Sequence, residues 1–156
     1  MTRYWSHLQP GESFATGQLT LDREAIIAFA AEFDPQPYHL DSAAAENSIF
    51  GGLCASGWQV TALMMRLLTD ALKEQGVPVL GIDSVPSLRW KIPVFAGDTL
   101  RGRVAVSGGE PISRQSGCGL TQLEIQVDNQ DGKPVVELTA VMLVAHGEQG
   151  EKNGVA

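Results

Sequence analysis

The sequence predicts an α+β fold in which one antiparallel sheet wraps a long helix. The helix is expected over residues 56–76, where apolar side chains recur at intervals of three and four residues: Val60, Leu63, Met64, Leu67, Leu68 and Leu72. Everything after it is typical of strands, and residues 99–106 and 121–127 alternate apolar and polar positions as a sheet with one wet face requires. A short strand and shorter helices come first, so a single sheet could cover the long helix.

The first part of the chain predicts a strand followed by a helix. Residues 13–21 favour a short strand, and residues 20–33 place apolar side chains at helical spacing, with Thr20 as the expected N-cap. Asp34 ends this helix, because a residue that precedes a proline is disfavoured in the α conformation. A second proline follows closely, so residues 34–39 are expected to be stiff and extended.

Turn residues divide the remainder of the chain. Residues 40–50 predict a short helix, which the glycines of the next segment end, and Gly76 and Pro78 stop the long helix. Turns rich in glycine, proline and Asp then separate four expected strands, at residues 79–92, 98–107, 115–129 and 134–146.

Length and composition bound what the protein can be. A chain of 156 residues with 44% hydrophobic residues fits one domain, expected over residues 1–146, and the polar, glycine-rich residues 147–156 are typical of a flexible tail. The net charge of −7, with scattered Lys and Arg, argues against a nucleic-acid partner, because phosphate neutralisation needs a basic stripe. Neither secretion nor a membrane span is indicated. The two cysteines do not have the spacing of metal ligands, and so few cysteines fit a reducing compartment. A cytoplasmic location is therefore expected.

Asp34 and His39 are the first candidates for chemistry. A carboxylate and an imidazole at the two ends of a proline-stiffened segment can hold one water between them and move protons. The alternative is structural: Asp34 would cap a turn and His39 would lie on the surface. Spacing alone leaves both interpretations open.

The second candidate is a glycine-rich turn at residues 50–58, which runs into the start of the long helix. Backbone N–H groups at a helix start lack partners within the helix, so that of Gly57 could bind an anion or a developing oxyanion. Ser56 could equally be the N-cap of a tightly packed loop. For Cys54, packing is favoured over nucleophilic chemistry, because free cysteines are commonly buried.

Metal and cofactor sites have no support in the sequence. His7 and His146 lie near the two ends of the chain without partners at ligand spacing. The sequence contains neither a dinucleotide-binding nor a phosphate-loop glycine motif, so no cofactor is expected.

Three segments together resemble the MaoC-like, (R)-specific enoyl-CoA hydratases. Residues 33–41, FDPQPYHLD, are similar to the D-x-N-P-x-H motif of that family, and residues 50–58, FGGLCASGW, fall where the family has an A-H-G turn into its central helix. Residues 88–106 carry its P-V-x-x-G-D core at Pro93, Val94, Gly97 and Asp98. The resemblance covers about residues 10–146, with the three motifs in the order of the family.

This resemblance implies a hot-dog fold, in which a curved antiparallel sheet wraps a long central helix, and a homodimer or larger homo-oligomer formed by edge pairing of two sheets. It implies reversible addition of water to a trans-2-enoyl thioester carried by coenzyme A or an acyl-carrier protein. Carried over to this sequence, Asp34 and His39 would hold the catalytic water, with the general base undecided between them. The N–H of Gly57 would bind the thioester carbonyl.

Four further residues are expected to serve the substrate. Gln36 stands in place of the asparagine of the motif, and Ser56 stands in place of the histidine before the oxyanion glycine. Arg89 and Lys91 are candidates to meet the pantetheine phosphates, although a solvated strand face would also explain them. A hot-dog acyl-CoA thioesterase, which would use the same oxyanion donor, is an alternative enzyme. The departures at residues 36 and 56 also keep open a non-catalytic module that binds acyl thioesters or serves as a dimerisation partner.

Overall fold

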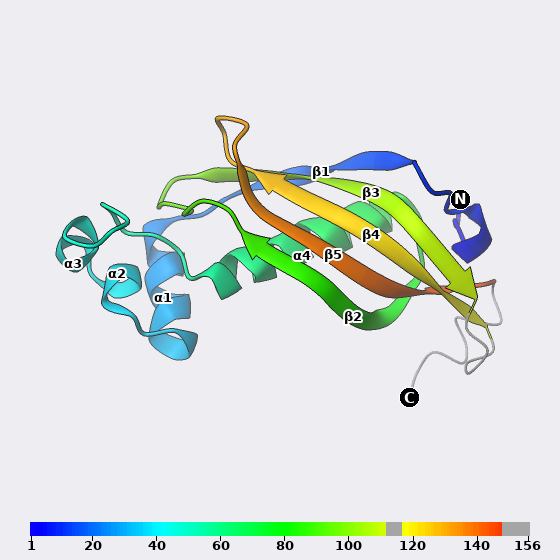
Figure 1. Ribbon diagram of the computed structural model, residues 1–156, viewed down its shortest axis with the longest axis horizontal. Coiled ribbons are helices and arrows are strands. Elements are labelled where there is room, and N and C mark those ends of the chain that lie inside the picture. The colour runs from blue at the N-terminus through cyan, green and yellow to red at the C-terminus, as the bar shows by residue number, and fades with distance from the viewer. Residues whose placement is uncertain (112–116, 148–156) are drawn as a thin grey trace.

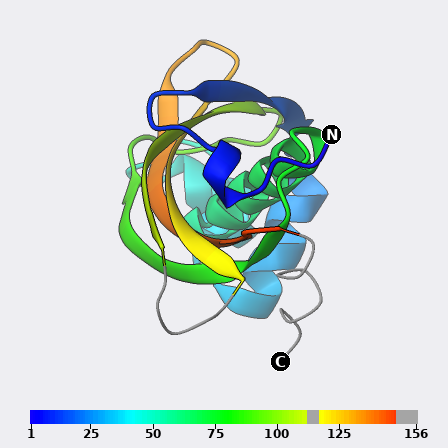
Figure 2. The ribbon, with the colours of Figure 1, turned by 90° about the vertical axis from the view of Figure 1, so that its right-hand side faces the viewer.

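In the computed structural model, five antiparallel strands form one sheet that curves around the long helix α4 (Figures 1 and 2). The structure describes residues 1–111 and 117–147. The strand order is β1-β3-β4-β5-β2, so β1 and β2 form the two edges, and the predicted α+β arrangement is confirmed. The elements are η1 (Trp5–His7), β1 (Ser13–Thr20), α1 (Arg23–Phe33), α2 (Pro37–Leu40), α3 (Ser42–Glu46), α4 (Gly57–Glu74), β2 (Val79–Trp90), β3 (Thr99–Pro111), β4 (Cys118–Asp128) and β5 (Pro134–Ala145).

The hydrophobic core lies between α4 and the concave face of the sheet. α4 turns most of its predicted apolar stripe inward, and Met64 and Leu68 are almost completely buried. They belong to the same buried cluster as Leu100 of β3 and Ile125 of β4. Removing each large apolar side chain from water stabilises the fold by about 1.5–3 kcal/mol. This packing holds the first turn of α4 in place relative to the sheet.

The start of α1 differs from the prediction. The N-cap is Asp22, whose carboxylate accepts a hydrogen bond from the Ala25 N–H at 2.8 Å. Thr20 is instead the last residue of β1, and its hydroxyl lies 2.8 Å from the hydroxyl of Thr99 on β3. The prediction of Thr20 as N-cap is therefore wrong, because pairing with β3 keeps Thr20 extended and Asp22 caps the helix equally well.

The proline-rich segment after α1 is extended only in its first half. Asp34 ends α1 as predicted, at φ −152° and ψ 70°. Pro37 then begins the short helix α2, so the prediction of an extended segment up to His39 is wrong. The physical reason is that proline is tolerated at the first position of a helix, where its missing N–H costs nothing. His39 therefore lies on α2 and not on an extended segment.

The four C-terminal strands lie close to their predicted bounds, and β3 extends further, to Pro111. Residues 115–116 of the third predicted strand, and residues 148–156 of the predicted tail, fall outside the described residues. The ring of His146, at the end of β5, stacks on Trp5 of η1 with centroids 4.9 Å apart. Within the described ranges, no helix is long and apolar enough to cross a membrane.

Candidate active site

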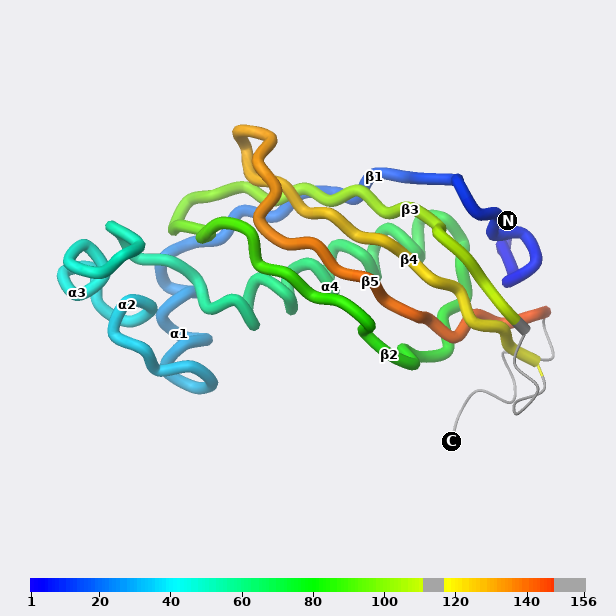
Figure 3. Tube along the Cα trace, in the orientation of Figure 1, coloured from blue at the N-terminus to red at the C-terminus, as the bar shows by residue number. Residues whose placement is uncertain are grey.

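The candidate site lies at the end of the sheet where α1, α2 and α3 gather (Figure 3). There the chain leaves α1 at Asp34, forms α2 around His39, and enters α4 at Gly57. The segment before α4 is tied to the loop after β2, because the Ala55 N–H donates to the Val94 carbonyl at 2.8 Å. The three motifs of the sequence therefore meet at the start of the central helix.

His39 is buried and its ring is fixed from the backbone. Its side chain is not on the surface, since only 6% of the residue is exposed. Nδ1 lies 2.6 Å from the carbonyl oxygen of Cys54. Because a carbonyl only accepts hydrogen bonds, Nδ1 donates in this contact, and in the tautomer with its single proton on Nδ1 the lone pair belongs to Nε2. Nε2 faces Oδ2 of Asp34 at 3.6 Å.

The Asp34 carboxylate is held by Ser56. The Ser56 hydroxyl donates to Oδ2 of Asp34 at 2.7 Å, and Ser56 is fully buried. Ser56 occupies the N-cap position of α4, but its side chain makes no capping hydrogen bond. The Ser56 side chain is also not among those that line the cavity described below. The structure therefore places the Ser56 hydroxyl on Asp34, away from the two roles considered from the sequence.

Gly57 begins α4, and no residue in the described part of the chain accepts a hydrogen bond from its N–H. The glycine is needed because a Cβ atom at this position would lie 2.8 Å from the Trp90 ring. The indole N–H of Trp90 donates to the Gly57 carbonyl at 2.8 Å and approaches the Thr61 hydroxyl at 3.1 Å. Trp90 thus holds the first turn of α4 by its ring and by its N–H, and leaves the Gly57 N–H free to bind a ligand.

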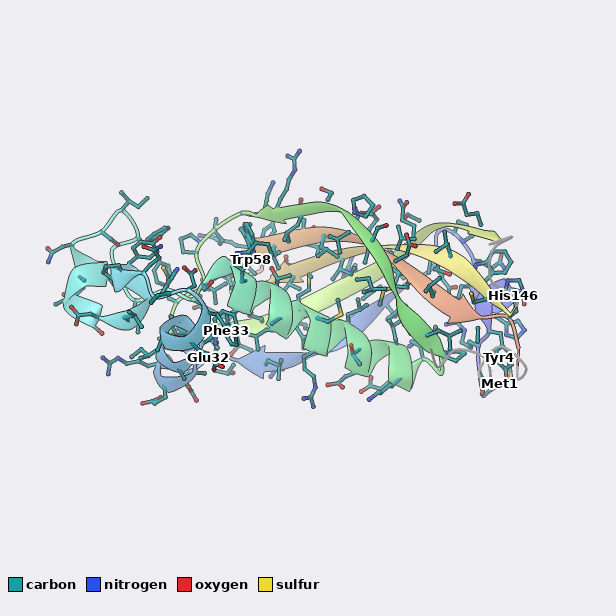
Figure 4. All side chains as sticks on the ribbon, turned by 90° about the horizontal axis from the view of Figure 1, so that it is seen from below. Met1, Tyr4, Glu32, Phe33, Trp58 and His146 are labelled. Carbon is teal, nitrogen blue, oxygen red and sulfur yellow. The ribbon has the colours of Figure 1, made fainter. Side chains whose placement is uncertain are left out.

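A cavity of about 400 Å³ contains Asp34, His39 and Gly57 together. Its other walls are mostly apolar and aromatic: Tyr38, Phe50, Cys54, Ala55, Trp58, Val60, Trp90, Lys91, Ile92, Pro93, Val94 and Val135. Figure 4 shows Trp58 on the first turn of α4, at the end of this helix that is far from His146. A few polar groups in an apolar hollow are typical of a small-molecule site.

The remaining predicted site residues are divided between the cavity and other surfaces. Lys91 lines the cavity, and its Nζ lies 3.9 Å from Oε2 of Glu137. Gln36 is exposed and does not line the cavity. Arg89 lies on the outer face of the sheet, in a larger hollow of about 530 Å³ that it shares with Arg103, Glu137 and other polar residues. That outer hollow contains none of the proton-transfer candidates, so we assign the chemistry to the smaller cavity.

Cys54 supports the packing interpretation. Its side chain is almost completely buried, and burial raises the pKa of the Cys54 thiol above its ordinary value. A raised pKa leaves less thiolate at neutral pH, which is unfavourable for a nucleophile. Among residues 1–111 and 117–147, no three His, Cys, Asp or Glu side chains come together as a set of metal ligands.

Sequence reasoning missed Trp90. Trp90 lies just before the motif at residues 93–98, but this position does not predict that its indole N–H donates to the Gly57 carbonyl. The reason is that β2 and the start of α4 are far apart in the sequence. An aromatic residue at the end of a strand is usually explained by packing alone. Trp58, whose ring lies 5.0 Å from that of Trp90 in a T-shaped arrangement, was missed for the same reason.

A family model described as the MaoC like domain matches residues 7–129. The chain belongs to the MaoC-like family. Its solved relatives include the MaoC-like dehydratase from Rhodospirillum rubrum, which is 37% identical, with a TM-score of 0.79 over 91% of this chain and 96% of that one. The hot-dog fold implied by the resemblance is thereby confirmed.

Two curated relatives match this MaoC-like chain over only part of their own lengths. Protein MaoC of Klebsiella aerogenes is 35% identical over 104 residues, which is 65% of this chain and 30% of the relative. The (R)-specific enoyl-CoA hydratase of Aeromonas caviae is 36% identical over 83 residues, which is 53% of this chain and 59% of the relative. The chain thus spans less than two thirds of both proteins, and the names of its relatives include a dehydratase and a hydratase.

Proposed function

We propose that this chain is an enoyl-thioester hydratase or dehydratase, which adds water reversibly to a trans-2-enoyl-CoA or carrier-protein thioester. The observation that carries the proposal is the meeting of three groups in one cavity: the Asp34 carboxylate, the Nε2 lone pair of His39 and the unpaired N–H of Gly57. Two acceptors and one donor are what the hydration of a conjugated thioester needs.

The water site follows from the two acceptors. Asp34 Oδ2 and His39 Nε2 are 3.6 Å apart, and each can accept a hydrogen bond. A single water can donate one hydrogen to each of them and direct its oxygen lone pair at the substrate. Such a pair acts as general base and general acid, and contributes about 10²- to 10⁴-fold in rate.

The reaction then proceeds without a cofactor. The water gives one proton to the Asp34–His39 pair as its oxygen forms a bond to C3 of the enoyl chain. The electrons of the C2–C3 double bond move toward the thioester carbonyl and form an enolate. The Asp34–His39 pair returns the proton to C2, and the product is a 3-hydroxyacyl thioester; dehydration is the reverse.

Gly57 stabilises the charge that develops on the carbonyl oxygen. Its N–H stands at the start of an 18-residue helix, where unpaired donors and the helix dipole both favour negative charge. The donor is already in place before the reaction, because Trp90 fixes the same turn. One donor of this kind is worth about 10²–10³ in rate.

Lys91 is the basic residue that best fits the carrier end of the thioester. It lines the cavity near Gly57, and its half-exposed ammonium is only loosely paired with Glu137 at 3.9 Å. A phosphate of the pantetheine arm can compete for such an exposed cation. Arg89 does not line this cavity, and it shares the outer hollow with Glu137, the partner of Lys91.

We also propose that the chain forms a homodimer through β2. This strand is an edge of the sheet, so one row of its backbone N–H and C=O groups is open to another chain. Its exposed apolar side chains are Ile82, Val85 and Trp90. A second copy that pairs with β2 around a two-fold axis would join the two sheets and cover these side chains.

A substrate panel tests the proposed function. The protein is incubated with crotonyl-CoA and with longer and branched enoyl-CoAs, and the absorbance of the conjugated thioester is followed together with free thiol. Hydration predicts loss of absorbance without thiol release. Thiol release from saturated acyl-CoA would instead indicate a thioesterase, and binding without turnover would indicate a non-catalytic module; either result contradicts the proposal.

A further inference from the structure

We propose that Ser56 is a positioning residue that keeps the Asp34–His39 pair open for water. This inference rests on the proposed function, and it concerns the geometry of the pair. The Ser56 hydroxyl donates to Oδ2 of Asp34 at 2.7 Å, and His39 Nε2 faces the same oxygen at 3.6 Å. Serine, not histidine, therefore holds the carboxylate oxygen that the two side chains share.

The distance of 3.6 Å is too long for a direct hydrogen bond between the imidazole and the carboxylate. Charge-assisted pairs that are free to approach settle at about 2.7–2.9 Å. A direct pair needs a proton between these two acceptors, so it forms only when Nε2 is protonated, and it would then close the place where one water contacts both groups. The Ser56 hydroxyl prevents this closure by holding Oδ2 on its own side.

Asp34 is the partner able to move if Ser56 is removed. His39 is anchored through Nδ1 to the Cys54 carbonyl at 2.6 Å, and its side chain is 7% exposed. The Asp34 side chain is 27% exposed and follows the end of α1, so its carboxylate can rotate about its side-chain bonds. Without the serine hydroxyl, we expect the carboxylate to turn toward Nε2 and to hold a proton there, in a direct pair with a doubly protonated ring.

Ser56 also links the pair to the proposed oxyanion donor. The donor N–H belongs to the peptide bond between Ser56 and Gly57, and the Ser56 carbonyl accepts the Val60 N–H at 3.1 Å. The side chain of Ser56 forgoes the capping hydrogen bond that a serine ordinarily makes at this position. One residue thus sets the carboxylate relative to the donor, which fixes where a water stands with respect to the substrate carbonyl.

The test compares Ser56→Ala, which removes the hydroxyl, with Ser56→Thr, which keeps it. Thr121→Val is the matched control: it also removes a buried hydroxyl, one that has no partner among the described residues and lies outside the site. We expect S56A to lower kcat about 10- to 100-fold while KM changes little, because misplacing reacting groups by about 1 Å costs that much. S56T should recover most of kcat, and T121V should retain wild-type kinetics.

A nitrogen-15 NMR spectrum of the His39 ring supplies a readout that does not need activity. In the wild type the Nε2 resonance should be that of an unprotonated nitrogen, and in S56A it should shift toward that of a nitrogen bonded to a carboxylate through hydrogen. An unchanged resonance together with wild-type kcat in S56A would overturn the inference. If the wild type hydrates no enoyl-CoA, the proposed function fails, whereas the NMR comparison of wild type and S56A still decides the role of Ser56.

Discussion

The Nδ1 atom of His39 lies 2.6 Å from the carbonyl oxygen of Cys54. This contact turns Nε2 toward Asp34, because the carbonyl only accepts hydrogen bonds and so engages Nδ1 as the donor. Cys54 also forms a β-bridge with Phe95, so the imidazole is fixed by backbone that joins the site to the loop after β2. The main chain thus helps to orient His39, and the Cys54 thiol also contacts Nδ1, at 3.8 Å.

Replacing Gly57 by alanine should disrupt the oxyanion donor. The added Cβ would lie 2.8 Å from the Trp90 ring, so the ring or the start of α4 must shift. We expect kcat to fall by roughly 10²-fold, as for other misplacements of about 1 Å. Gly17→Ala is the matched control, because nothing lies within 4 Å of its added Cβ. Steady-state kinetics of both variants check this, and equal activity would contradict the claim that catalysis needs a glycine against the Trp90 ring.

Replacing Trp90 by phenylalanine should weaken catalysis without unfolding the protein. The aromatic ring is kept, but the N–H that donates to the Gly57 carbonyl at 2.8 Å is lost. A hydrogen bond worth about 0.5–1.5 kcal/mol corresponds to a loss of about 2- to 12-fold in kcat.

Trp5→Phe provides the control for this change. It removes an indole hydrogen bond of the same length, to the Leu120 carbonyl at 2.8 Å, on η1. That variant should lower the unfolding midpoint and leave kcat unchanged. If both variants reduce kcat equally, Trp90 has no special relation to Gly57.

The sequence predicts the helices and strands that carry this site better than it predicts the contacts between their side chains. The helix α4 and the strands carry regular periodicity, which burial on one side imposes. Pro37 was misjudged because a proline favours both an extended segment and the first position of a helix, and only tertiary packing chooses between them. Arg89 and Lys91 would share one face of a continuing strand, but β2 ends at Trp90, so Lys91 reaches the cavity and Arg89 does not.

Ser56 shows a second limit of sequence reasoning. A serine just before a helix is usually its cap, and local pattern gives no way to know that a carboxylate from another helix lies 2.7 Å away. Gln36 shows the converse: it occupies a motif position, yet its side chain is exposed outside the cavity. Contacts between motifs depend on how α1, α2 and α4 pack, which periodicity does not encode.

Burial of Cys54 should make stability depend on alkaline pH. Its thiol has a pKa raised above the ordinary value of 9.0 by desolvation, so the unfolded state releases the proton first as the pH rises. The contribution of Cys54 to stability is therefore complete below pH 9.0 and is lost as the pH rises through the higher pKa of the folded state. Denaturant unfolding at several pH values checks this, and Cys54→Ala should flatten the alkaline fall in the free energy of unfolding.

A charge on β2 should dissociate the proposed dimer. Val85 is 44% exposed on this edge strand, and Val85→Lys would place an ammonium group at the centre of the interface. Light scattering should give half the wild-type mass for this variant. Ile49→Lys is the control, since Ile49 is 95% exposed in the segment between α3 and α4. An unchanged mass for V85K would rule out pairing through β2.

The central claim, that Asp34 and His39 activate water against an enoyl thioester, is tested most directly by hydration of crotonyl-CoA in matched aspartate variants. Asp34→Asn removes the carboxylate that faces Nε2, whereas Asp41→Asn makes the same change at a residue that caps α3 and leaves the cap intact. With both variants folded, we predict that D34N loses about 10²-fold or more in kcat and that D41N keeps wild-type activity. Wild-type hydration by D34N would contradict the account.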